Sequence, residues 1–180
     1  MKIVKVILIG LVSLLALVLI VAIFLKKEYA VEREITINKP KAEVFEYVKL
    51  LKNQDNFSVW AMRDPNMKKE FKGTDGTVGF TSAWDSDMKH VGKGEQEIKK
   101  ITEGERIDYE LRFIKPFEAT DNAYLSFASA DSTQTQVKWG FDGKMKYPMN
   151  IMLVFMDMDK MLGSDLETGL QNLKAVLEKQ

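Results

Sequence analysis

The feature that most constrains this chain is an uncharged apolar run near its N-terminus. Residues 6–25 read VILIGLVSLLALVLIVAIFL and contain no charged side chain. As a helix rising about 1.5 Å per residue, this run is about 30 Å long, which matches the hydrocarbon thickness of a bilayer. Lys2 and Lys5 precede the run, and Lys26 and Lys27 follow it, where their ammonium groups can reach lipid headgroups. The sequence therefore predicts a single membrane-spanning helix.

A cleavable signal peptide is the alternative interpretation of this run. The apolar region of a signal peptide has about 7–15 residues and is followed by a cleavage site with small residues. The run here is longer, and the segment IFLKKEYA at its end offers no such site. We therefore expect an uncleaved anchor over residues 1–27, followed by one domain over residues 28–180.

The side of the membrane on which this domain lies follows less directly. Basic residues near a membrane-spanning segment favour the cytoplasmic side. More of them follow the apolar run than precede it, which favours a cytoplasmic domain. A short basic N-terminus before an anchor is nevertheless common in exported proteins, so both orientations stay open.

The composition argues against several classes of function. Basic and acidic residues number 26 each, whereas nucleic-acid-binding proteins usually have a basic excess, so we expect no nucleic-acid partner. The absence of cysteine excludes disulfides, cysteine-ligated zinc and thiol nucleophiles, and a single histidine excludes a multi-histidine metal site. Gly92 and Gly94 lack the third glycine of a dinucleotide-binding motif. We expect neither a metal nor a cofactor.

Hydrophobic periodicity predicts the order of elements after the anchor. Residues 29–37 alternate as a strand does, and residues 41–51 carry apolar side chains at helical spacing. A short helix or turn is expected over 53–60. Residues 67–146 then contain about six strands separated by glycine-rich or polar turns. The clearest is 107–113, whose alternation predicts one buried and one hydrated face.

The C-terminal part is expected to form a long amphipathic helix that starts after Pro148. Its apolar positions include Ile151, Val154, Phe155 and Met158, which keep the spacing of one helical face. A strand, one or two helices, about six strands and a long helix together predict an α+β fold. In such a fold the helices cover one face of an antiparallel sheet.

Three segments carry a resemblance to a known family. They are EREITINKPKAEVFEYV, then GTVGFTSAW followed by VGKGEQEI, and finally DLETGLQNLKAVLEK. Through these segments residues 29–178 resemble the START-like, or SRPBCC, superfamily in its polyketide cyclase-like branch. The resemblance implies the helix-grip fold, a curved antiparallel sheet wrapped around a long C-terminal helix. It also implies a deep cavity between the two, used across the superfamily for lipids, sterols, polyketides and other apolar ligands.

The residues proposed to line this cavity are mostly aromatic, because aromatic rings supply large apolar contact areas. The candidates are Trp60, Ser82, Trp84, Tyr109, Phe113, Trp139, Phe141, Met152 and Phe155. Ordinary core packing would explain the same side chains. Six of the ten methionines lie between residues 145 and 161, where they suit a pocket mouth, a membrane-facing surface or adaptable core packing.

Candidate catalytic groups are weaker. Asp85, Asp87 and His90 bring together residue types that could form a weak metal site or an acid–base pair, but an exposed loop explains them equally well. The superfamily includes carriers as well as enzymes and shares no catalytic motif, so the catalytic residues stay unknown. If the protein is an enzyme, Tyr109, Ser82 and Asp85 are the candidates.

These observations predict a membrane-anchored domain that binds an apolar or amphipathic small molecule, such as a lipid or a polyketide-like compound. One alternative is a cyclase- or hydrolase-type enzyme that uses a polar group in the cavity. The other is a protein-interaction module with a vestigial cavity and an unknown partner.

Overall fold

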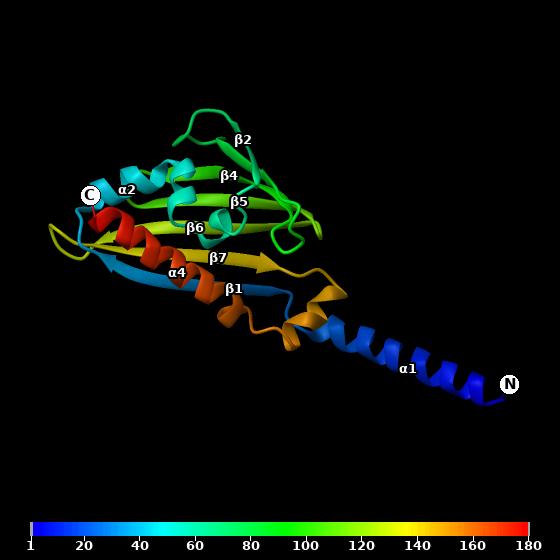
Figure 1. Cartoon of the computed structure of the whole chain (residues 1–180). Helices are drawn as coiled ribbons and strands as arrows, with labels where there is room; N and C mark the ends of the chain where they lie inside the picture. The colour runs from blue at the N-terminus through cyan, green and yellow to red at the C-terminus, as the bar shows by residue number, and fades with distance from the viewer. Residues whose placement is uncertain (1, 180) are drawn as a thin grey trace.

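A computed structural model of the chain describes residues 2–179. It has an N-terminal helix that projects from one end of a curved antiparallel sheet, and a C-terminal helix that lies across one face of that sheet (Figure 1). The elements in chain order are α1 (Lys2–Phe24), β1 (Glu28–Ile37), α2 (Lys41–Lys49), η1 (Leu51–Asn56), α3 (Val59–Met62), β2 (Lys68–Lys72), β3 (Thr81–Asp85), β4 (Lys93–Thr102), β5 (Arg106–Lys115), β6 (Ala119–Ser129), β7 (Thr135–Lys144), η2 (Met149–Val154) and α4 (Met158–Glu178).

The sheet has seven strands in the order β1-β7-β6-β5-β4-β3-β2. Strands β2 to β7 follow one another as hairpins, and β1 adds to the sheet beside β7. Because the first and last strands are neighbours, α4 can fold back directly over them after β7. The α+β helix-grip fold predicted from the sequence is confirmed.

The core lies between α4 and the sheet face that it covers. Four leucines at helical spacing on α4, Leu166, Leu170, Leu173 and Leu177, are fully or almost fully buried. In β5 the predicted alternation holds, with Ile107 and Tyr109 buried while their neighbours are only half-buried. This burial of alternating strand positions against one helical stripe is what fixes the sheet to α4.

The predicted start of the C-terminal helix was wrong. Residues 149–154 form the short 3-10 helix η2, and α4 begins only at Met158. The Asp157 side chain accepts a hydrogen bond from the backbone N–H of Lys160, which caps the new helix start. Val154 and Phe155, whose spacing continues that of α4, therefore precede the helix and are exposed.

Helix α1 is long and apolar enough to cross a membrane, a property that signal sequences share. It joins the sheet closely, because only residues 25–27 separate it from β1. Asn150 of η2 is fully buried and donates from Nδ2 to the carbonyl oxygens of Ala22 (2.7 Å) and Leu25 (3.3 Å). The backbone N–H of Met145 donates to the carbonyl of Lys27 at 2.8 Å. The last turn of α1 is therefore held against η2 and the end of β7.

Gly169 sets how closely α4 approaches the sheet. A Cβ at this position would lie 2.7 Å from Cζ3 of Trp139, which is too short for two carbon atoms. We expect Gly169→Ala to lower the free energy of unfolding by about 1 kcal/mol, because the overpacking exceeds the gain in helix propensity. The full chain in detergent micelles, unfolded by urea and followed by near-UV circular dichroism, measures this change. Ser164→Ala on the exposed side of α4 is the control and should not destabilise; a gain in stability for Gly169→Ala would contradict the prediction.

Candidate functional site

A pocket of about 390 Å³ lies between the sheet and the helical segments that cover it. Its walls come from strands β2 to β7, from η1 and α3, and from Leu162 in α4. This volume is within the usual range for small-molecule sites, about 300–1,000 Å³. The pocket therefore occupies the part of the sheet face that α4 leaves uncovered.

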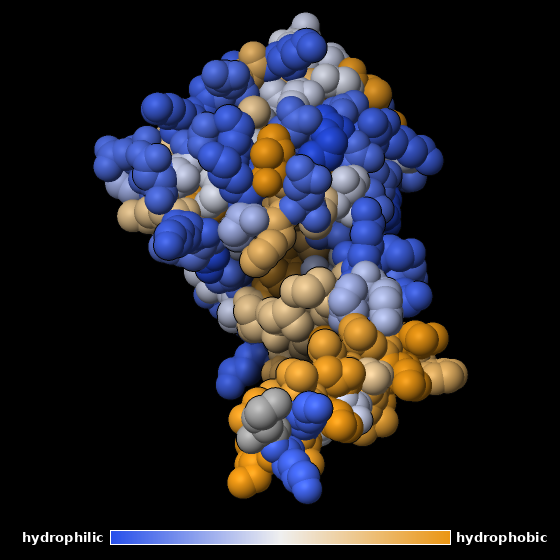
Figure 2. All heavy atoms as spheres, turned by 90° about the vertical axis from the view of Figure 1, so that its right-hand side faces the viewer, coloured by the Kyte–Doolittle hydropathy of each residue, from blue (hydrophilic) through white to orange (hydrophobic). Residues whose placement is uncertain are grey.

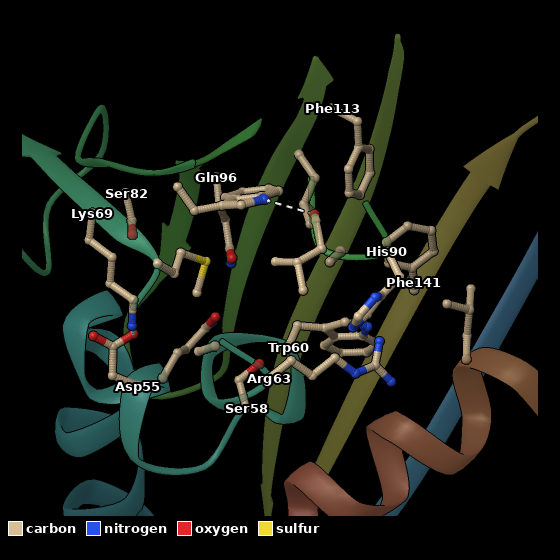
Figure 3. Close-up of a pocket in the computed structure, with 18 of the residues that line it drawn as sticks. Asp55, Ser58, Trp60, Arg63, Lys69, Ser82, His90, Gln96, Phe113 and Phe141 are labelled. Atoms are coloured by element: carbon tan, nitrogen blue, oxygen red, sulfur yellow. Dashed lines mark hydrogen bonds and ion pairs between the residues drawn. The ribbon is translucent and has the colours of Figure 1, made fainter. Parts of the chain in front are cut away.

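Aromatic side chains form much of the wall. Trp84 and Phe113 meet edge-to-face with their ring centroids 5.9 Å apart, and Trp60 and Trp139 do the same at 5.9 Å. Phe141 also lines the pocket (Figure 3). Edge-to-face contact is a favoured geometry for aromatic pairs, so the two rings of each pair hold one another in place and present a preformed apolar surface.

The local sequence explains why the ring of Trp84 leaves room in the pocket. Trp84 pairs across the sheet with Gly94, and Gly94 pairs with Phe113. A Cβ on Gly94 would lie 2.5 Å from Cζ2 of Trp84, so only glycine allows the indole to lie against the strand. The indole N–H donates to the carbonyl of Val91 at 3.4 Å.

The inner end of the pocket is polar. Ser82 of β3 pairs with Gln96 of β4, two residues along the strands from the Trp84–Gly94 pair and therefore on the same face of the sheet. Figure 3 shows Ser82 and Gln96 on the same side of the pocket as Lys69, whose Nζ lies 2.7 Å from Oδ1 of Asp55. Beyond them the core is closed by three fully or almost fully buried residues, Phe80, Ile98 and Tyr109.

Gln54 is the most unusual lining residue. It is only 7% exposed, and its Nε2 has no hydrogen-bond partner among residues 2–179. The hydroxyl of buried Tyr109 makes no hydrogen bond within these residues either, although the Gln54 side chain lies close enough to oppose the rise in the pKa of Tyr109. Burial raises the pKa of Tyr109 far above its ordinary value, so the phenol stays protonated. An unsatisfied buried donor costs about 1–3 kcal/mol, so a ligand that supplied an acceptor oxygen here would gain that interaction.

The mouth of the pocket lies at the end of the sheet where α1 joins it. The exposed lining residues include His90, Pro116 and Phe117, from the β3–β4 loop and the β5–β6 turn. Lys93 pairs with Lys115, so this loop and this turn lie at the same end of the sheet. Strand β7 ends there too, beside the last turn of α1.

Comparison with known proteins agrees with this architecture. Residues 29–178 match the family described as polyketide cyclase/dehydrase and lipid transport. The chain belongs to this family. The match covers nearly all of the chain after α1, and it confirms the superfamily predicted from the sequence. No curated protein matches the sequence of this chain.

Solved structures share the fold at low sequence identity. Norcoclaurine synthase from Thalictrum flavum, in complex with dopamine and hydroxybenzaldehyde, is similar with a TM-score of 0.63 and 8% identity, covering 85% of this chain and 88% of the synthase. An uncharacterized protein from Rhizobium leguminosarum gives 0.59 and 14%, covering 86% and 97%. The Aha1 dimer from Colwellia psychrerythraea gives 0.56 and 12%, covering 83% and 96%. At these identities the likeness establishes the fold alone.

The fold brings six of the nine residues predicted from the sequence to the pocket wall. They are Trp60, Ser82, Trp84, Phe113, Trp139 and Phe141. Tyr109 instead lies in the closed core beyond the polar end, and Met152 and Phe155 are exposed in and after η2. Met152 belonged to the methionine cluster considered for the pocket mouth, and Phe155 to the apolar face of the predicted C-terminal helix; both lie before α4 begins.

Several lining residues were missed by the sequence reading. Gln54 and Ser58 lie in and after η1, where the pattern gave no preferred face. Gln96 lies between Gly94 and Ile98 on the inward side of β4, so strand alternation could have identified it. Phe117 follows Pro116 in a turn, a position with no periodic signal.

The sequence cluster of Asp85, Asp87 and His90 does not assemble. Asp85 accepts a hydrogen bond from Lys93 at 2.7 Å, which holds the pKa of Asp85 below its ordinary value. His90 lies at the pocket mouth, and Asp87 is exposed. Within residues 2–179, no group of three histidine or carboxylate side chains is arranged to hold a metal ion.

Asp121 is a buried carboxylate beside the same end of the sheet. Its Oδ1 accepts a hydrogen bond from the backbone N–H of Lys144 at 2.9 Å. Burial raises the pKa of Asp121, and this hydrogen bond only partly offsets the effect. Burial, with a contribution from Asp121, also raises the pKa of Tyr29 to about 12.

The charge on Asp121 should therefore reduce stability at neutral pH. Since its folded pKa is raised, the protonated form is favoured by folding, and this stabilisation is lost as the pH rises through the folded value. Asp121→Asn keeps the carbonyl acceptor and removes the charge, so we expect a higher Tm at pH 8 and a smaller fall in Tm between pH 4 and pH 8. Thermal unfolding of the full chain in detergent measures both. Asp142→Asn, at an exposed position of β7, should leave the profile unchanged, and an equal response from the two variants would refute the assignment.

Proposed function

We propose that this protein binds a mainly apolar, amphipathic small molecule, such as a lipid, in the pocket of a membrane-anchored domain. Residues 1–27 would be the anchor and residues 28–180 the ligand-binding domain. The observation that carries this proposal is the pocket itself, with aromatic walls, the buried Gln54 donor that makes no hydrogen bond within residues 2–179, and a mouth beside α1.

The distribution of polarity supports an amphipathic ligand. A polar oxygen of the ligand would face Gln54, Ser82 and Gln96 at the inner end. Its apolar body would lie along the aromatic wall and point to the mouth. Apolar burial supplies most of the binding free energy in such sites, at about 25 cal/mol per Å², and the few polar groups fix the orientation.

The position of α1 supports a membrane source for the ligand. A helix of this length and hydropathy would keep the domain at a bilayer surface, where amphipathic molecules are concentrated. The mouth lies at the same end, so a ligand could pass between bilayer and pocket over a short path.

The family and one structural neighbour support small-molecule binding in this fold. The family description includes lipid transport, and norcoclaurine synthase was solved with two small aromatic molecules bound. The enzymatic alternative has less support. Of its three candidates only Ser82 lines the pocket, because Tyr109 is enclosed in the core and Asp85 is paired with Lys93. The open volume of the pocket argues against a vestigial cavity.

Photo-crosslinking tests occupancy of the pocket. With palmitic acid carrying a diazirine and the full chain in nanodiscs, we expect labelled peptides from residues 51–69 and 82–96 as well as from α1. Ala119→Trp would fill the mouth and lower pocket labelling several-fold, whereas Thr120→Trp, on the opposite face of β6, would not. Labelling of α1 should be equal in both variants, and this controls for partition into the membrane. Labelling confined to α1, or equal pocket labelling in two variants that retain the near-UV spectrum, would contradict the proposal.

Gln54→Leu tests the polar inner end. The substitution keeps the side-chain volume and removes the unpartnered amide, so the delipidated protein should gain about 1 kcal/mol in free energy of unfolding. The same variant should bind less added palmitate, read as the bound fraction in native mass spectra of the full chain released from micelles. Gln171→Leu makes the same change at an exposed position of α4 and should alter palmitate binding little. Lower stability with unchanged binding would assign Gln54 a purely structural role.

A further inference from the structure

Exposed apolar side chains lie at the end of the domain from which α1 leaves it. They come from three separate segments: the β5–β6 turn, η2 with the residue that follows it, and the first turn of α4. We define the apolar collar as Phe117, Met149, Met152, Val154, Phe155 and Met161. Phe155 is 83% exposed and Phe117 is 76% exposed, the largest values for large apolar side chains outside α1 in the described chain. A protein surface in water rarely gathers such side chains without a partner.

The collar is continuous with the surface of α1. Figure 2 views this end of the molecule and shows hydrophobic surface running from α1 onto the adjoining face of the domain, with hydrophilic side chains on both flanks. This continuity argues that one apolar medium covers both surfaces.

Hydrogen bonds hold η2, the segment that contains Met149, Met152 and Val154 of the collar, to the end of α1. Asn150 donates to the carbonyls of Ala22 and Leu25, which belong to the last turn of the apolar run. The start of η2 is therefore tied to the level at which the run ends. In a membrane-spanning helix this level is the boundary between acyl chains and headgroups, where apolar side chains of interfacial segments insert by about 5–10 Å.

Charge near the collar is consistent with the same level. Lys26, Lys27 and Lys146 are exposed beside the last turn of α1, where ammonium groups can reach lipid phosphates. Asp157 and Glu118 also flank the collar, so apolar contact rather than net charge would supply most of the attraction.

We infer that the apolar collar is a bilayer-interface surface that inserts into the headgroup–acyl boundary around α1. Phe117 belongs to the collar and also lines the pocket, so insertion places the pocket mouth against the bilayer. This inference rests on the membrane anchoring proposed above and does not depend on which ligand the pocket holds.

Site-directed spin labelling tests the inference, because the natural chain contains no cysteine. Phe155→Cys and Phe117→Cys report on two segments of the collar, Leu14→Cys on the middle of α1, and Ser132→Cys on the β6–β7 turn at the opposite end of the sheet. The labelled full-length proteins are reconstituted into phosphatidylcholine–phosphatidylglycerol liposomes. Collision rates of each nitroxide with lipid-soluble oxygen and with a water-soluble nickel chelate are then measured.

We expect the ratio of oxygen to nickel collisions to be highest at position 14, several-fold lower at positions 155 and 117, and several-fold lower again at position 132. If position 14 is lipid-exposed but 155 and 117 are as accessible to nickel as 132, the collar is in water and the inference is overturned while the anchor stands. If 155 and 117 are shielded from both reagents, a protein surface covers them, and this also overturns it. Nickel access at position 14 would remove the anchor itself, and the collar proposal with it.

Discussion

The structure depends on a mismatch of widths between one helix and a seven-stranded sheet. Strands about 4.8 Å apart make a sheet about 30 Å wide, whereas a helix with its side chains is about 10 Å across. Helix α4 packs over β1 and β7, with Gly169 letting it reach Trp139, and cannot also cover β3, β4 and β5. Helix α2 packs against β6, and the short helical segments η1 and α3 cover the part of the face that lines the pocket. The pocket is the space that remains between these two segments and the sheet.

The opposite face of the sheet carries charged side chains and faces the solvent. Arg112 in β5 pairs with Glu110 of the same strand and with Glu95 and Glu97 of the neighbouring strand β4, all on the outward side of the sheet. These four side chains remain partly exposed and satisfy one another, so burying them completely under a second layer of structure would be unfavourable. The edge strand β2 is short and carries lysines, which discourages pairing with another sheet. The two most exposed large apolar side chains of the domain, Phe155 and Phe117, lie instead at the end beside α1.

Sequence periodicity was informative wherever one rule governed a whole element. The alternation in β5 identified its buried face, and large aromatic residues on inward strand positions identified part of the pocket wall. Helical periodicity gave a wrong prediction at Val154 and Phe155. Their i, i+4 and i, i+3 spacing to Met158 is the same whether the chain forms one continuous helix or, as here, two separate helical segments. Gln54 could not be found at all, since its significance comes from being buried without a partner, which is a property of the folded chain.

The three-residue connection between α1 and β1 has a consequence for how the protein could work. A lipid shuttle that crosses an aqueous gap needs a tether long enough to release its domain from the donor membrane. Here the connecting segment is too short to act as such a tether, and the hydrogen bonds of Asn150 hold the domain to the end of α1. With α1 in a bilayer, the protein would sample its surroundings by two-dimensional diffusion, and a bound molecule would be handed to enzymes or carriers that meet it on the same membrane.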